Sequence, residues 1–291
     1  MHPGSFALVM ATGIVSVGAA QAGRPALSWA LFGVGAAAFL ALAALVAVRG
    51  SELRRVEALT FVAGSGVLGA RLALAGDLRP ALALWALAAA VWAALVAPVL
   101  VDLVRRHEAR RSGSALLAVV APESLAVLGA ILGRRLHTGA LTEASEALWA
   151  AGLLAYALLA PGVCSRLARA AVARRGSHGD DWIAMGALAI ATVAAGELAL
   201  AHAALALWAA ATAVLPLVVA AELRGGLRRY ELQRWATVFP LGMYAVASYE
   251  VGAVDGSGLL GDIGFAVFWI ALAAWALTAL AMARAHRAPQ L

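Results

Sequence analysis

Ten long apolar stretches fill this sequence, and their side-chain chemistry alternates along the chain. A helix that crosses a bilayer needs about 20 mostly apolar residues. The break between the seventh and eighth stretches is placed at His202, because together they hold about forty residues, too many for one crossing. The predicted spans are 4–21, 26–48, 56–76, 79–103, 114–134, 142–163, 182–204, 205–222, 233–254 and 261–283. The sequence therefore predicts an all-α integral membrane protein with ten transmembrane helices in one domain, residues 1–291.

Composition narrows the class of protein further. Hydrophobic residues make up 64% of the chain and charged residues 13%, whereas soluble domains carry about a quarter charged residues. The net charge of +6 lies in short arginine clusters between apolar stretches, which is typical of membrane topology signals rather than of nucleic-acid binding. Cys164 is the single cysteine, and the histidines show no metal-ligand spacing. We therefore expect a lipid bilayer as the surroundings, no nucleic acid partner, no metal and no cofactor.

The arginines also predict an orientation. Of 22 arginines, 17 fall at the ends of spans on the same side as the N-terminus, and 5 fall on the other side. Positively charged loops stay in the cytoplasm, so we expect a multi-pass protein of the plasma membrane with both termini cytoplasmic. The first stretch lacks a charged leader and a cleavage site, so it is expected to be retained.

The odd-numbered stretches differ from the even-numbered ones. They carry most of the mid-span glycines, hydroxyls and charges, and their centres are Gly-rich or interrupted by proline, whereas seven of nine tryptophans lie on even stretches. Such residues are tolerated in a membrane where protein or water satisfies the backbone, which predicts five helical hairpins whose odd helices surround a central pore. Tight packing through small residues is the alternative. The residues expected to line the pore or kink its helices are Thr12, Gly13, Ser16, Ser65, Pro122, Thr237 and Pro240.

Four intramembrane charges follow the same alternation, namely Arg71, Glu123, Glu197 and Glu250. An ionisable group in the hydrocarbon region is costly, so each should face protein or a water-filled cavity. Arg71 is either an anion-attracting group in an outer vestibule, or a structural partner of Glu197 or Glu250, or a side chain that reaches the interface. Glu123 either caps backbone freed by Pro122 or serves as a protonatable coupling site.

Two segments resemble a known family. The first stretch reads FALVMATGIVS over residues 6–16, after His2-Pro3-Gly4, and the ninth reads RWATVFPLGMYA over residues 234–245. They are similar to the tellurite-resistance and C4-dicarboxylate transporter family, which includes slow-type anion channels, malate permeases and sulfite efflux pumps. The resemblance implies five hairpins around a pore, a homotrimer with one pore per subunit, and Phe239 as an aromatic gate. Ordinary helix packing is the alternative role of Phe239.

The resemblance implies a function in transport. We expect small anions, either C4-dicarboxylates such as malate or inorganic anions such as chloride or sulfite, to pass through the pore. A proton-coupled dicarboxylate carrier with Glu123 or Glu197 as the proton site is the alternative. An enzyme should show His, Asp or Glu clustered at one depth, and here they are scattered, so no catalytic residue is assigned. A membrane-embedded enzyme or scaffold is the least favoured alternative. The acids on the inner helices and Arg234 before Trp235 depart from the family's pattern.

Overall fold

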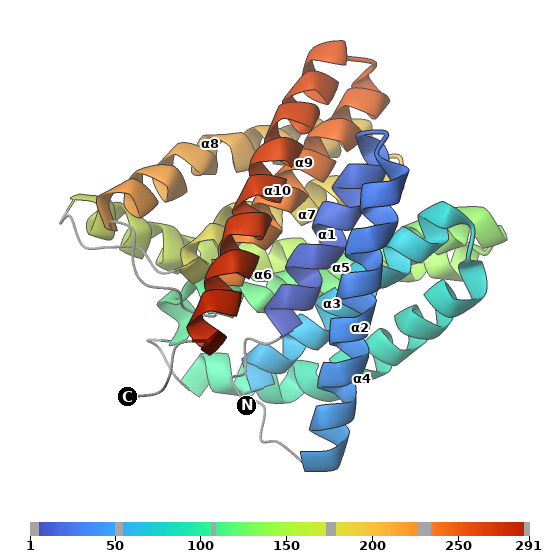
Figure 1. Cartoon of the computed structure of the whole chain (residues 1–291), viewed down its shortest axis with the longest axis horizontal. Helices are drawn as coiled ribbons and strands as arrows, with labels where there is room; N and C mark the ends of the chain where they lie inside the picture. The colour runs from blue at the N-terminus through green and yellow to red at the C-terminus, as the bar shows by residue number, and fades with distance from the viewer. Residues whose placement is uncertain (1–5, 50–54, 106–108, 173–178, 226–233, 288–291) are drawn as a thin grey trace.

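Ten long α-helices form the protein in the computed structural model, which describes residues 6–49, 55–105, 109–172, 179–225 and 234–287 (Figure 1). They are α1 (Phe6–Gln21), α2 (Pro25–Arg49), α3 (Arg55–Ala75), α4 (Leu78–Arg105), α5 (Leu117–Leu136), α6 (Gly139–Val172), α7 (Ile183–Glu197), α8 (Ala201–Gly225), α9 (Trp235–Asp255) and α10 (Gly258–Arg287). Seven of them are long and apolar enough by themselves to cross a bilayer. The prediction of an all-α, ten-helix membrane protein is confirmed.

The turn between α7 and α8 lies earlier than the sequence predicted. It falls at residues 198–200, where Ala199 has a left-handed backbone with φ of 60°. The backbone N–H groups of Leu200 and Ala199 return to the carbonyls of Ala195 and Gly196, over 2.8 and 2.9 Å. This is the usual way to close a helix, but glycine normally occupies the left-handed position. The placement of the break at His202 was therefore wrong by a few residues, since His202 lies in the first turn of α8.

The odd helices form a closed inner ring. Each contacts the next in the order α1, α3, α5, α7, α9 and back to α1, and each even helix packs against the odd helix that precedes it. Within the α5 span 94% of residues are buried, against 11% within the α4 span. The expected division into five inner and five outer helices is confirmed, because the outer helices cover the ring and present apolar side chains outward.

Glycines bring neighbouring inner helices together. A Cβ atom added at Gly66 would lie 2.8 Å from the Cβ of Ser124 on α5, and one added at Gly242 would lie 2.7 Å from Ile14 on α1. Close approach of this kind is a common use of small residues in membrane helices. The packing role of the glycines and the inner position of the odd helices, offered by the sequence as alternatives, therefore occur together.

Two parts of the sequence prediction fall outside the described residues. They are the segment His2-Pro3-Gly4 and much of the arginine-rich connections, at residues 50–54, 106–108, 173–178 and 226–233. Among the connections that are described, the Asp180 carboxylate accepts hydrogen bonds from the Ser112 hydroxyl and the Ser114 backbone N–H, over 2.8 and 3.0 Å. Arg166 forms an ion pair with Asp181 nearby. The bonds to Asp180 join the segment before α5 to the segment before α7, and the ion pair joins α6 to that same segment before α7.

Candidate permeation pathway

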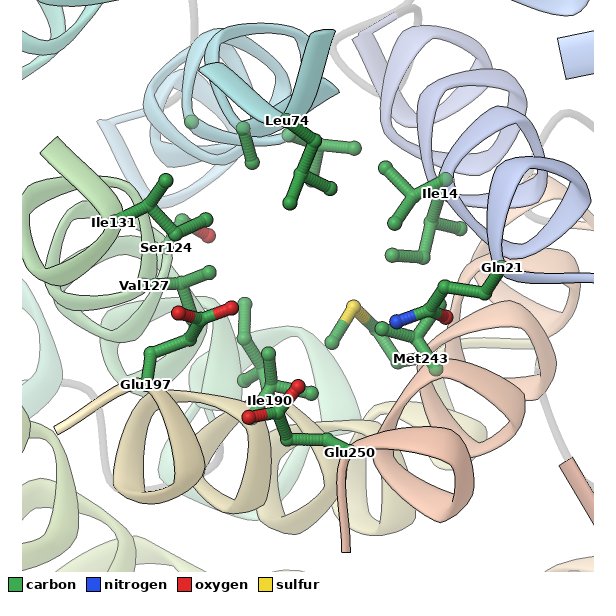
Figure 2. A pocket seen from close by; sticks show the side chains of 16 residues that line it. Ile14, Gln21, Leu74, Ser124, Val127, Ile131, Ile190, Glu197, Met243 and Glu250 are labelled. Carbon is green, nitrogen blue, oxygen red and sulfur yellow. The ribbon is translucent and has the colours of Figure 1, made fainter. Parts of the chain in front are cut away.

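A cavity of about 120 Å³ lies inside the ring, and all five odd helices line it (Figure 2). That volume is several times larger than the space that one water molecule needs. Fifteen of its sixteen lining residues form five triplets with the same spacing, in which residue i is followed by i+3 and i+7. Such residues share one face of a helix. Each inner helix therefore contributes one equivalent stripe to the cavity.

The triplets define three levels, each with one residue from every inner helix. The first level is Ile14, Val67, Ser124, Ile190 and Met243. The second level is Val17, Ala70, Val127, Val193 and Val246. The third level is Gln21, Leu74, Ile131, Glu197 and Glu250. Two levels are thus almost entirely apolar, and the charged groups of the cavity gather at the third, toward the C-terminal ends of the odd helices.

The hydroxyls of Thr12 and Ser16, expected at the pore, do not line this cavity. Thr12 accepts a hydrogen bond from Trp275 Nε1 on α10 over 2.9 Å. The hydroxyls of Ser16 and Ser28 on α1 and α2 each donate to the other residue's carbonyl oxygen, over 2.7 Å. The physical reason is that an inner helix is surrounded on all sides, and only one stripe of it faces the cavity. The hydroxyl that lines the cavity belongs instead to Ser124, which donates to the Val120 carbonyl over 2.6 Å.

The remaining pore-lining or kink candidates lie within helix contacts. Ser65 is buried and donates to the Phe61 carbonyl of its own helix over 2.9 Å. Thr237 Oγ1 is buried without a hydrogen-bond partner in the described part of the chain. Gly13 packs on Val67, and α5 and α9 continue through Pro122 and Pro240. Pro240 packs on α7, where a Cβ added at Gly186 would lie 2.9 Å from it.

Arg71 faces α2 and not the other charges. Its Nε donates to Ser28 Oγ over 2.7 Å, and its guanidinium carbon lies 4.2 Å from the centre of the Trp29 ring. The pairing with Glu197 that the sequence left open is wrong, because Arg134 bonds the Glu197 side chain and its backbone carbonyl. The charge of Arg71 is thus held by a hydroxyl and an aromatic face, outside the cavity lining.

The three acids are in different surroundings. Glu197 and Glu250 line the cavity at its third level, and Figure 2 shows both carboxylates directed into it. Glu123 is completely buried and faces Gly152 on α6, where an added Cβ would overlap its side chain. Neither of its carboxylate oxygens has a hydrogen-bond partner within the described residues.

Phe239 lies one helical turn before Met243, on the stripe of α9 that lines the cavity. The equivalent residues of the other inner helices, each four positions before the first level, are Met10, Ala63, Val120 and Gly186. All five are buried, and Phe239 is 2% exposed. Phe239 therefore belongs to the level at which the cavity ends.

Sequence reasoning missed Gln21, Ser124 and Arg134 as residues of this region. The sequence analysis used Arg134 only as one of the five arginines on the side opposite the N-terminus, although it follows Ile131 by less than one turn on α5. The spacing of three and then four residues can be read from every odd stretch of the sequence. The sequence does not show which residue of one helix lies level with which residue of the next. That register comes from the ring contacts, which align triplets starting at residues 14, 67, 124, 190 and 243.

Comparison with known proteins gives a match over nearly the whole chain. The model of the family described as voltage-dependent anion channel matches residues 1–283. Two uncharacterized membrane proteins of Mycobacterium tuberculosis, from strains CDC 1551 and H37Rv, are each 44% identical over 54 residues. These residues are 19% of this chain and 27% of either relative, so the chain spans about a quarter of their length. The family match confirms the resemblance seen in the first and ninth helices, and it indicates a transport protein rather than an enzyme.

Proposed function

The chain belongs to the voltage-dependent anion channel family, and on that premise we propose that small anions pass through the centre of its five-helix ring. The supporting observation is the cavity, to which every inner helix contributes an equivalent stripe. Chloride, sulfite and C4-dicarboxylates such as malate are the candidate anions. Conduction requires that an ion bind well enough to enter and weakly enough to leave, and the wall offers Gln21 and Ser124 as hydrogen-bonding groups among apolar side chains.

Phe239 is the proposed gate of this pathway. At its level α3 contributes only Ala63, beside which an aromatic side chain on α9 can extend into the ring, while Gly186 of α7 is covered by Pro240. An apolar constriction blocks ions by excluding water. Truncation of the Phe239 side chain should therefore open a continuous water-filled pathway.

The experiment is anion conductance in reconstituted bilayers for wild type and Phe239→Ala. We expect a severalfold higher conductance in the variant. Phe268→Ala is the matched control, because Phe268 is equally buried but lies on α10 against Gly18. It should leave the conductance near the wild-type value. An unchanged conductance in Phe239→Ala removes the gate assignment.

A proton-coupled dicarboxylate carrier is the alternative, and the positions of its expected proton sites do not favour it. Glu123 faces α6, and Glu197 is bonded by Arg134. Uptake of labelled malate into proteoliposomes with and without a pH gradient separates the two functions. A channel should show uptake that follows the malate gradient and the membrane potential alone.

We further propose a plasma-membrane homotrimer with one pathway per subunit and both termini in the cytoplasm. The arginine distribution supports the orientation, and the family supports the assembly. Protease accessibility of a C-terminal tag in intact cells tests the first. The mass of the purified protein by light scattering in detergent tests the second.

A further inference from the structure

The third level of the cavity is chemically uneven. It combines Gln21, Leu74 and Ile131 with the two acids Glu197 and Glu250, which stand on the neighbouring helices α7 and α9. Gly196 explains how they fit, because a side chain at that position would overlap the side chain of Glu250. Figure 2 shows both carboxylates at the same side of the cavity. An anion that uses this end of the pathway must pass them.

The two acids, Glu197 and Glu250, differ in whether a cationic side chain is bonded to them. Arg134 bonds Glu197 through both its carboxylate and its backbone carbonyl. Glu250 forms no ion pair in the part of the chain that the structure describes. Two further cations lie on the inner helices near this level: Arg135 of α5 acts electrostatically on Glu197, and Arg71 is held on the α2 side by Ser28. Arg134 and Arg135 thus lie by Glu197, and Glu250 is the acid of this level that has no ion pair of its own among the described residues.

We propose that Glu250 is a specificity-determining residue that selects among anions by their charge, favouring monovalent anions over divalent ones. The proposal rests on the proposed anion pathway. Coulomb repulsion is proportional to the product of the two charges, so a fixed carboxylate opposes a dianion twice as strongly as a monoanion. Rings of fixed charge are a general means of ion selection in channels. The substrate class is then a small monoanion rather than a doubly ionised dicarboxylate.

The experiment compares chloride flux with sulfate and succinate flux in proteoliposomes, in wild type and in a Phe239→Ala background. The flux is measured at an alkaline pH of about 8, because only the ionised carboxylate carries the charge that the proposal requires. Glu250→Gln should raise divalent flux more than chloride flux, lowering the chloride-to-divalent ratio about threefold or more. Arg134→Gln leaves Glu197 uncompensated and should change the ratio in the opposite direction.

Asp255→Asn is the matched control, because it removes an exposed acid from the last turn of the same helix, outside the cavity lining. Its flux ratio should equal that of the parent protein. An unchanged ratio in Glu250→Gln overturns the inference while the anion pathway stands. If Glu250→Gln does not fold, an unchanged ratio in Arg134→Gln overturns it instead. No anion flux in the Phe239→Ala background overturns the proposed function itself.

Discussion

Trp275 on the last helix donates its indole N–H to the hydroxyl oxygen of Thr12 on the first, over 2.9 Å. The same indole packs edge-on to Trp235 at the start of α9, with the ring centres 6.4 Å apart. α1 and α9 are the helices at which the inner ring closes on itself. Trp275 therefore joins both sides of that closure with one side chain, and it does so across 263 residues of sequence.

Loss of this hydrogen bond should weaken the closure. Thr12→Val keeps the shape of the side chain but removes the acceptor, and it leaves the part-buried indole N–H of Trp275 without this partner. We expect a loss of about 1 kcal/mol in the free energy of unfolding, measured by thermal unfolding in detergent. Thr12→Ser keeps the hydroxyl and is the control. In a double-mutant cycle with Trp275→Phe, strictly additive effects would show that the bond contributes nothing.

Gly66 should tolerate no side chain. A Cβ there would lie 2.8 Å from the Cβ of Ser124 and 3.0 Å from its backbone oxygen, so α3 and α5 would have to separate. We expect Gly66→Ala to cost about 1–3 kcal/mol and to lower the unfolding temperature. Gly33→Ala on α2 is the control, because nothing lies within 4 Å of an added Cβ at that position. Equal unfolding temperatures for the two variants would contradict the close approach.

The span count and the division into inner and outer helices could be predicted from the sequence, because both depend on composition averaged over whole stretches. The direction in which a single residue faces could not be predicted from the sequence. Ile14 lines the cavity and Thr12 does not, yet α1 is apolar on every side, so no hydrophobic face marks its orientation. The turn at Ala199 carried no signal either, since neither glycine nor proline marks it. The bond from Arg134 to Glu197 depends on the contact between α5 and α7, which the sequence does not show.

Arg71 should matter for stability and not for anion selection. Its contacts with Ser28 and Trp29 tie α3 to α2, and it lies outside the cavity lining. Arg71→Gln should cost about 1–2 kcal/mol of stability through the lost hydrogen bond and cation–π contact. The chloride-to-divalent flux ratio should stay at the wild-type value. Arg79→Gln, at an exposed position of α4, is the control and should change neither quantity. A shifted ratio in Arg71→Gln would place its charge on the pathway.

Glu123 should be replaceable by an apolar side chain of similar size. Its two carboxylate oxygens are buried without hydrogen-bond partners in the described residues, against Gly152. Removing unsatisfied buried polar atoms is often neutral or stabilising, so Glu123→Met should keep or raise the unfolding temperature and leave chloride flux intact. A carrier that uses Glu123 as its proton site predicts the reverse: the variant would lose the dependence of malate uptake on a pH gradient. Comparing both measurements in Glu123→Met and Glu123→Gln decides between a structural acid and a coupling site.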